Sequence, residues 1–290
     1  MNNLSKLDLI TLDKDLSEEQ RQEWNSIYAS FRAGSILTGK VVGMDTNTIT
    51  VKKNGRDESV IVHSLVVIAY RVKVLIPESE IWYDENSKRP PYVLRSMTGT
   101  TIDYVITDID REGECAVASR RKALEVKRRS FAKTKPKPGD KISCRVSAVG
   151  RTHLLAEAGG YDMTLSQRDL SYGMLSDLRQ DYRPGHDLIS VIKEFDSKSG
   201  KLSISVKEAE PHPFDGADIR HPIGSRRASK ITGKYGGGVF CRLDKNLDCM
   251  CVYSANQQDT DFRVDDEVIV VITRCNYEKK QIYGKIVAKW

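Results

Sequence analysis

The 290-residue chain carries a formal net charge of +6 at pH 7, with 39% hydrophobic and 7% aromatic residues and six cysteines. This length accommodates two or three domains, and no apolar run reaches the roughly 18 residues that cross a bilayer. The cysteines form no Cys-x-x-Cys pair and no regular framework, which argues against a secreted disulfide scaffold and a zinc site. We therefore expect a cytoplasmic protein with no membrane partner, no metal and no signal peptide.

Residues 1–33 are expected to hold a tail followed by one helix. Ser17 and Gln20 form a capping-box pattern, and Gly34 can end the helix. Between them, apolar residues recur on one helical face at Trp24, Ile27, Tyr28 and Phe31. The spacing predicts a helix that packs this face against the next unit or against a partner protein.

A strand–turn–strand pattern then occurs three times, at residues 99–121, 185–207 and 265–287. In each copy, apolar residues alternate on both sides of a polar turn, and the turn begins eleven residues after the first residue of the segment. Alternation with a period of two around such a turn is typical of a β-hairpin. Its ordered recurrence predicts an internal repeat.

Each hairpin closes a longer unit that opens with a glycine and a strand-like run. Units of this size, with about five short strands and no helical crossover, are typical of small antiparallel barrels. The first unit is about twenty residues longer, and its extra segment contains an apolar run long enough for an additional strand pair. Turns are expected at Asp45-Thr46-Asn47 and at Asn54-Gly55. The fold class is therefore all-β, with three tandem five-stranded barrels at residues 34–122, 139–210 and 217–290.

The basic excess lies in the connector at residues 123–138 and in the residues just before it. Residues 120–137 hold nine Lys or Arg and one Glu, so the rest of the chain is slightly acidic. Such a cluster favours contact with a polyanion, and the alternative is a solvated linker helix. The candidate phosphate-binding residues are Arg120, Arg121, Lys127, Arg128 and Arg129.

Four segments resemble elements of the S1 domain, an RNA-binding OB fold that is repeated in bacterial ribosomal protein S1. Residues 74–80, Val-Leu-Ile-Pro-Glu-Ser-Glu, are similar to its middle element, and residues 117–123 and 202–207 to its closing strand. Residues 234–241, with Tyr235 and Phe240, are similar to its aromatic element. The three units that carry the resemblance span about 250 residues, and it implies three S1-type OB folds with an N-terminal helix.

The resemblance also implies which unit meets RNA. S1 domains place aromatic residues on their second and third strands and a basic residue after the last turn, so that bases stack while phosphates are neutralised. The first and second units lack aromatic residues in the corresponding segments, 46–50 and 151–155. The third unit retains the set at Tyr235, Phe240, Arg242, Tyr253 and Lys280.

We therefore expect a non-catalytic protein that binds single-stranded RNA, such as mRNA, in translation. It would be an elongated monomer without a cofactor, and the small ribosomal subunit is a candidate partner. Two alternatives are a protein–protein adaptor that uses residues 17–33 and 60–70, and a single-stranded DNA-binding protein. The sequence shows no nucleophile–base pair, no glycine-rich phosphate loop and no dense carboxylate cluster, so no catalytic residue is assigned.

Overall fold

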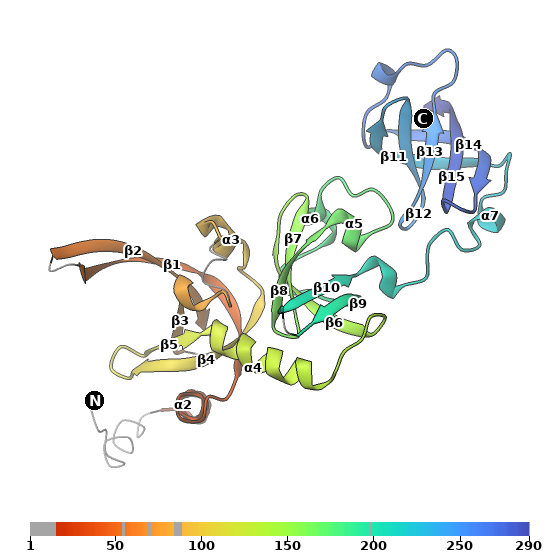
Figure 1. Cartoon of the computed structure of the whole chain (residues 1–290). Coiled ribbons are helices and arrows are strands. Elements are labelled where there is room, and N and C mark those ends of the chain that lie inside the picture. The colour runs from red at the N-terminus through yellow and green to blue at the C-terminus, as the bar shows by residue number, and fades with distance from the viewer. Residues whose placement is uncertain (1–15, 54–55, 69–70, 84–88, 198, 290) are drawn as a thin grey trace.

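The computed structural model describes residues 16–53, 56–68, 71–83, 89–197 and 199–289, with the backbone alone at 49–53 and 56–58. One helix, α2 (Glu18–Ala33), precedes three β-rich units that follow one another along the chain (Figure 1). Each unit holds five strands, so the expected all-β architecture of three tandem OB folds is confirmed.

The first unit is a closed barrel in the strand order β1-β2-β3-β5-β4. Parallel pairing of β3 with β5 completes the closure and places Val74 opposite Ala116. Ile102, Tyr104 and Ile106 alternate along β4 and are buried in the core, as their period of two predicts. The elements are β1 (Leu37–Lys53), β2 (Arg56–Ile68), β3 (Lys73–Pro77), η1 (Glu78–Glu80), α3 (Pro91–Ser96), β4 (Thr101–Asp110) and β5 (Cys115–Ser119).

The hairpin of β1 and β2 continues beyond this barrel as a two-stranded arm (Figure 1). β4 pairs with β1 at residues 37–40, and β3 pairs with β2 at residues 64–68, whereas β1 and β2 stay paired out to Lys53 and Arg56. The extra residues of the first unit therefore lengthen two strands.

Two predictions for this arm are wrong. The first is the prediction of an additional strand pair, because β2 is one continuous strand. The turn at Asp45-Thr46-Asn47 is also wrong, because these residues lie within β1 opposite Ser64, His63 and Val62. A continuous partner strand here outweighs the turn preference of Asp and Asn. The predicted turn at Asn54-Gly55 lies outside the described residues.

Helix α2 covers one side of the first barrel. The Ser17 Oγ accepts from the Gln20 amide and the Gln20 side chain accepts from the Ser17 amide, which confirms the capping box. Gly34 ends the helix at φ 68°, in the left-handed region that glycine adopts without strain. Trp24 and Ile27 are buried in the barrel cluster, whereas Phe31, expected on the same face, is 47% exposed.

The connector forms helix α4 (Arg120–Lys133), which begins directly after β5. The second unit follows as a five-stranded sheet in the order β10-β9-β6-β7-β8, with no ladder between β8 and β10 within the described residues. It is therefore barrel-like but open along that seam. Its elements are β6 (Lys141–Val149), β7 (His153–Ala158), β8 (Tyr161–Ser166), α5 (Gln167–Leu170), α6 (Leu178–Asp181), β9 (Asp187–Asp196), β10 (Lys201–Ser205) and η3 (Lys207–Ala209).

The third unit is a closed barrel in the order β11-β12-β13-β15-β14, completed by parallel pairing of β13 with β15. Its core includes Val239, Ile272 and Ile282, all fully or almost fully buried. Its elements are α7 (Ala217–Arg220), β11 (Arg226–Tyr235), β12 (Gly238–Asp244), β13 (Leu247–Val252), η4 (Asp259–Asp261), β14 (Glu267–Asn276) and β15 (Gln281–Lys289).

All six cysteines are free thiols, and Cys241, Cys249 and Cys251 point into the third core. In the described part of the chain, no group of three or more His, Cys, Asp or Glu side chains is placed to hold a metal ion. None of the helices described is long and apolar enough to cross a membrane.

Candidate nucleic-acid interface

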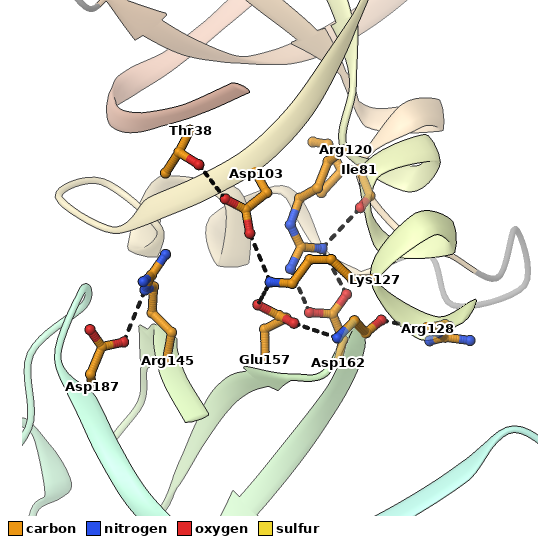
Figure 2. Close-up of polar contacts among 11 residues, drawn as sticks. Thr38, Ile81, Asp103, Arg120, Lys127, Arg128, Arg145, Glu157, Asp162 and Asp187 are labelled. Carbon is orange, nitrogen blue, oxygen red and sulfur yellow. Dashed lines mark hydrogen bonds and ion pairs between the residues drawn. The ribbon is translucent and has the colours of Figure 1, made fainter. Parts of the chain in front are cut away.

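Helix α4 lies between the first and second units and joins them through ion pairs (Figure 2). The Arg120 guanidinium donates to both carboxylate oxygens of Asp162 on β8, each at 2.7 Å, and to the Ile81 carbonyl oxygen at 3.0 Å. Two turns further along, the Lys127 ammonium donates to Asp103 of the first unit at 2.7 Å and to Glu157 of the second at 2.6 Å. The helix therefore clamps the two sheets with charges from both sides.

Apolar and backbone contacts complete this interface. Ala148 and Leu155 of the second unit belong to the buried cluster of the first. The Thr100 hydroxyl donates to the Val146 carbonyl oxygen at 3.0 Å. At Gly160, a Cβ would lie 2.6 Å from the Leu124 carbonyl oxygen, so only glycine allows the β7–β8 turn to approach α4 this closely.

The pKa shifts agree with this geometry. Burial alone would lower the pKa of Arg120 and of Lys127, but attraction to Asp162 for the first and to Glu157 for the second raises both above their ordinary values. Burial would raise the pKa of Asp103, but hydrogen bonds, chiefly from Lys127, hold it below its ordinary value. The network therefore favours the charged forms of Arg120, Lys127 and Asp103 inside the interface.

The structure places the five basic candidates of the connector in different surroundings. Arg120 is 2% exposed, and Lys127 is held between its two carboxylates. Arg121 pairs with Glu80 at 2.6 Å. Arg129 is exposed and pairs with Glu125 on its own helix, and Arg128 points away from the clamp toward two tyrosines. Most of the positive charge at the start of α4 is thus used within the protein.

In the third unit, Tyr235 and Phe240 lie together on the outer surface of the barrel. Neither belongs to the buried cluster, and their ring centroids are 5.1 Å apart. The Tyr235 ring lies over Gly238, where any Cβ would be 2.6 Å from its hydroxyl oxygen, and that hydroxyl donates to the Cys251 carbonyl oxygen. The glycine therefore makes room for the ring on the strand surface.

The strand register extends this aromatic pair into a row across the outer face. Phe240 on β12 is opposite Met250 on β13, and Met250 is opposite Tyr283 on β15. Arg274 on β14 is opposite Tyr283 and places its guanidinium 4.4 Å from the ring centroid. Because neighbouring strands are about 4.8 Å apart, these side chains form a continuous strip of planar and polarizable groups that ends in a cation.

One end of this strip opens into a cleft of about 340 Å³ between the second and third units. Phe240 and Met250 line it from the barrel, and Lys280 lines it from the β14–β15 turn. The opposite wall holds Tyr172, whose ring centroid lies 4.1 Å from that of His212. Phe240 and Lys280, both predicted from the sequence, are thus brought to the same cleft.

Arg242 and Tyr253 occupy other positions. Arg242 bonds to Asp248 and to the Met174 carbonyl oxygen, so it fastens a loop of the second unit to the third barrel. Tyr253 stacks on Phe262 with centroids 5.5 Å apart and donates its hydroxyl to Asp259. Neither side chain joins the strip that contains Phe240.

Sequence reasoning missed Met250, Tyr283, Arg274 and Tyr172. The first three follow from register, since Met250 and Tyr283 lie at outward positions of strands whose alternate residues are buried. That alternation was visible in the sequence, but the pairing of β13 with β15 was not. Tyr172 comes from another unit, and no local pattern marks it.

The fold and the repeated topology define a protein of three tandem S1-like OB-fold units. Comparison with known proteins agrees, in that the chain shows distant similarity over most of its length to small ribosomal subunit protein bS1. The chain is 19% identical over 275 residues to that protein of Pseudomonas aeruginosa, which covers 91% of this chain and 45% of the relative. It is 20% identical over 270 residues to that of Coxiella burnetii, with 89% and 45% covered.

Another relative is a 4-hydroxy-3-methylbut-2-enyl diphosphate reductase from Clostridium acetobutylicum, 23% identical over 75% of this chain and 35% of its own. The chain spans less than half the length of these three curated relatives. No family model matches the sequence.

Among solved structures, a multidomain protein with nucleic acid binding domains from Streptococcus pneumoniae aligns with 88% of this chain and 73% of its own at 10% identity and a TM-score of 0.21. An a/eIF2alpha–aDim2p–rRNA complex from Pyrococcus horikoshii covers 30% of this chain and 52% of the matched chain, at 12% identity and a TM-score of 0.24. At these TM-scores the assignment of the fold depends on the sheet topology.

Proposed function

We propose that this protein binds single-stranded RNA without catalysing a reaction, and that the outer face of the third barrel is the main binding surface. The observation that supports this most is the strip of Phe240, Met250, Tyr283 and Arg274 across four adjacent strands. Every base presents a π-face, so such a strip accepts bases without regard to sequence. Because each stacked base contributes on the order of 1–3 kcal/mol, two rings give modest affinity on their own.

Basic side chains beside the strip supply the electrostatic part. Lys279 and Lys280 line the cleft that adjoins Phe240, and Arg274 lies at the other end of the strip. A strand that stacks on the rings would place its phosphates near these cations. In this proposal the first and second units have a structural role, because Arg120, Arg121 and Lys127 of α4 pair with their carboxylates.

The matched relatives also bear on the partner. Several are named as a protein of the small ribosomal subunit. By this likeness we propose that the bound RNA is mRNA, and that the small ribosomal subunit is the place of action. The fold alone does not set a function, so the argument depends on the residues of the third barrel.

The proposal is tested with the full chain and a fluorescein-labelled 12-nucleotide oligouridylate in a fluorescence anisotropy titration. The variant Phe240→Ala/Tyr283→Ala removes two rings, and affinity should fall roughly tenfold or more. Tyr92→Ala is the matched control, because Tyr92 is a 67% exposed aromatic residue on the first unit, and its affinity should equal that of the unaltered protein. Equal loss in both variants, or no loss in the first, contradicts the proposal. Competition with oligothymidylate of the same length separates RNA from single-stranded DNA.

The β1–β2 arm favours a second candidate function, that of a protein adaptor. Ile61 is 63% exposed and its neighbour Val60 is 39% exposed on this arm, outside the barrel. An extended pair of strands with exposed aliphatic side chains can add to a partner's surface. Association with the small ribosomal subunit that persists after ribonuclease treatment and is lost in Ile61→Lys would support this function. Loss of that association on ribonuclease treatment would favour RNA binding alone.

A further inference from the structure

A second cavity, of about 570 Å³, lies where the first unit, α4 and the second unit meet. Its walls come from three separate parts of the chain. Trp82 and Tyr83 follow η1 of the first unit, Arg128 and Arg129 come from α4, and Tyr161 begins β8. Arg89 and Ser199 complete the opposite sides. A volume of this size is in the range of small-molecule sites.

Two of the three arginines that line this cavity, Arg89 and Arg128, contact aromatic rings, whereas Arg129 pairs with Glu125. The Arg128 guanidinium lies 3.6 Å from the centroid of Tyr83 and 4.3 Å from that of Tyr161, so two rings lie close to it. Its Nε donates to the Gly160 carbonyl oxygen at 2.8 Å. Arg89 lies 4.9 Å from the ring centroid of Trp82. These ring contacts position both guanidinium groups at the cavity, and guanidinium groups are suited to binding oxyanions.

Among the described residues, the negative charge nearby does not balance Arg89 and Arg128. Asp162 is the one carboxylate among the described lining residues, and both of its oxygens accept from Arg120, which is buried. No ion pair joins Arg89 or Arg128 to a carboxylate within the described residues. Burial lowers the pKa of both side chains, which is the effect of charge placed away from water without a full counter-charge.

We propose that this cavity binds a nucleotide, with its phosphate on the guanidinium edges of Arg89, Arg128 and Arg129 and its planar base against the aromatic wall. Arginine is suited to phosphate because its donors match two phosphate oxygens at once. The surrounding rings supply flat apolar surface, and Ser199 adds a hydroxyl group at the rim. The ligand is a free nucleoside monophosphate or the phosphorylated end of a strand. This inference does not depend on the proposed function, because the cavity lies between other units.

The inference is tested by isothermal titration of the full chain with adenosine monophosphate, uridine monophosphate, adenosine and inorganic phosphate. We expect the monophosphates to bind and adenosine to bind at least tenfold more weakly. In Arg89→Gln/Arg129→Gln, monophosphate affinity should fall roughly tenfold or more, because hydrogen bonds to charged groups contribute more to the binding free energy than neutral ones. Lys122→Gln is the matched control, because it removes one charge from an exposed position of the same helix outside the cavity lining, and its affinity should not change.

Several results overturn the inference. Equal binding of adenosine and adenosine monophosphate would exclude a phosphate site. If inorganic phosphate bound as tightly as the nucleotide, recognition of a nucleotide would be excluded. Binding of a phosphoserine peptide as tightly as the nucleotide would exclude it as well. Unchanged affinity in Arg89→Gln/Arg129→Gln would place the ligand elsewhere. Arg128 is left unaltered because its contacts with Gly160 and Tyr161 support the fold.

Titrations of the unaltered protein and of Phe240→Ala/Tyr283→Ala identify the source of the ligand and test whether the two sites are independent. If a 5′-phosphorylated hexanucleotide binds more tightly than both its 5′-hydroxyl form and the mononucleotide, the ligand is the phosphorylated end of a strand. If the mononucleotide binds more tightly, the ligand is a free nucleotide. Phe240→Ala/Tyr283→Ala should keep its affinity for monophosphate. Loss of monophosphate binding in that variant would overturn the assignment to this cavity, whereas loss of oligouridylate binding alone concerns the third barrel.

Discussion

Replacing Asp162 with alanine would leave the Arg120 guanidinium buried without its main counter-charge. Arg120 is 2% exposed and Asp162 has 9% of its side chain exposed, so water cannot readily replace the lost carboxylate. Removing one partner of such a pair typically costs about 3–5 kcal/mol. Glu157 and Asp103 also attract Arg120, so we expect a value near the lower end, about 3 kcal/mol.

The assay is urea unfolding followed by tryptophan fluorescence. Trp24 and Trp82 are both buried in the first unit, and the Trp82 ring lies 5.8 Å from the Arg120 guanidinium. With a slope of about 2 kcal/mol per M, the midpoint of that transition should fall by about 1.5 M urea. As a control, Glu194→Ala removes a carboxylate from an exposed pair with Lys201 and should leave the midpoint unchanged.

A second variant separates lost charge from lost packing. In Arg120→Met/Asp162→Leu both charges are replaced by apolar groups of similar volume, and stability should return to within about 1 kcal/mol of the original. If Asp162→Ala costs less than about 1 kcal/mol, the pair is not buried in solution as the structure describes it. If the double variant is as unstable as the single one, packing rather than unpaired charge sets the cost.

Four further predictions concern the clamp and the connector. Gly160→Ala should weaken the contact between α4 and the second unit, since its φ is +88° and a Cβ would lie 2.8 Å from the Arg128 amide nitrogen; limited proteolysis should then cleave residues 120–138 faster than in the original protein. The lowered pKa of Asp103 contributes stability that is present above about pH 3.9, its unfolded value, and is lost as the pH falls through the folded value, so Asp103→Asn should remove part of the acid dependence of the unfolding midpoint. The raised pKa of Lys127 contributes stability that is present below about pH 10.4, its unfolded value, and is lost as the pH rises through the folded value. Lys127→Met should therefore reduce the fall of the unfolding midpoint at alkaline pH. If the exposed residues Lys133, Lys135 and Lys137 contact RNA phosphates, replacing them with serine should reduce the slope of log affinity against log salt by roughly 2, and an unchanged slope would place this end of the connector away from RNA.

Much of the architecture could be predicted because it depends on local patterns. The alternation around each hairpin, the capping box at Ser17 and the glycine at position 34 all act over a few residues, and the structure contains each of them. The arm of the first unit could not be predicted in the same way. Its residues 45–47 favour a turn in isolation, but they remain in β1 because β2 offers hydrogen-bonding partners along that whole length.

The candidate site was predictable in part for a related reason. The sequence marked the aromatic residues Tyr235 and Phe240, and their positions on the outer face follow from strand alternation. The cluster of charge in the connector was equally visible, but its partners lie 24–42 residues away in other units. Whether a lysine faces solvent or an opposing carboxylate is decided by tertiary contacts, which composition does not record.

The clamp made by α4 has a consequence for how this chain can change over time. A buried ion pair between two units ties the identity of position 120 to that of position 162, because altering either one alone passes through an unstable intermediate. More divergent descendants should therefore keep both residues or exchange both together for apolar ones. Although the first and second units have the same fold, we therefore expect them to be inherited together, because recombination that exchanged one of them alone would separate the two charges.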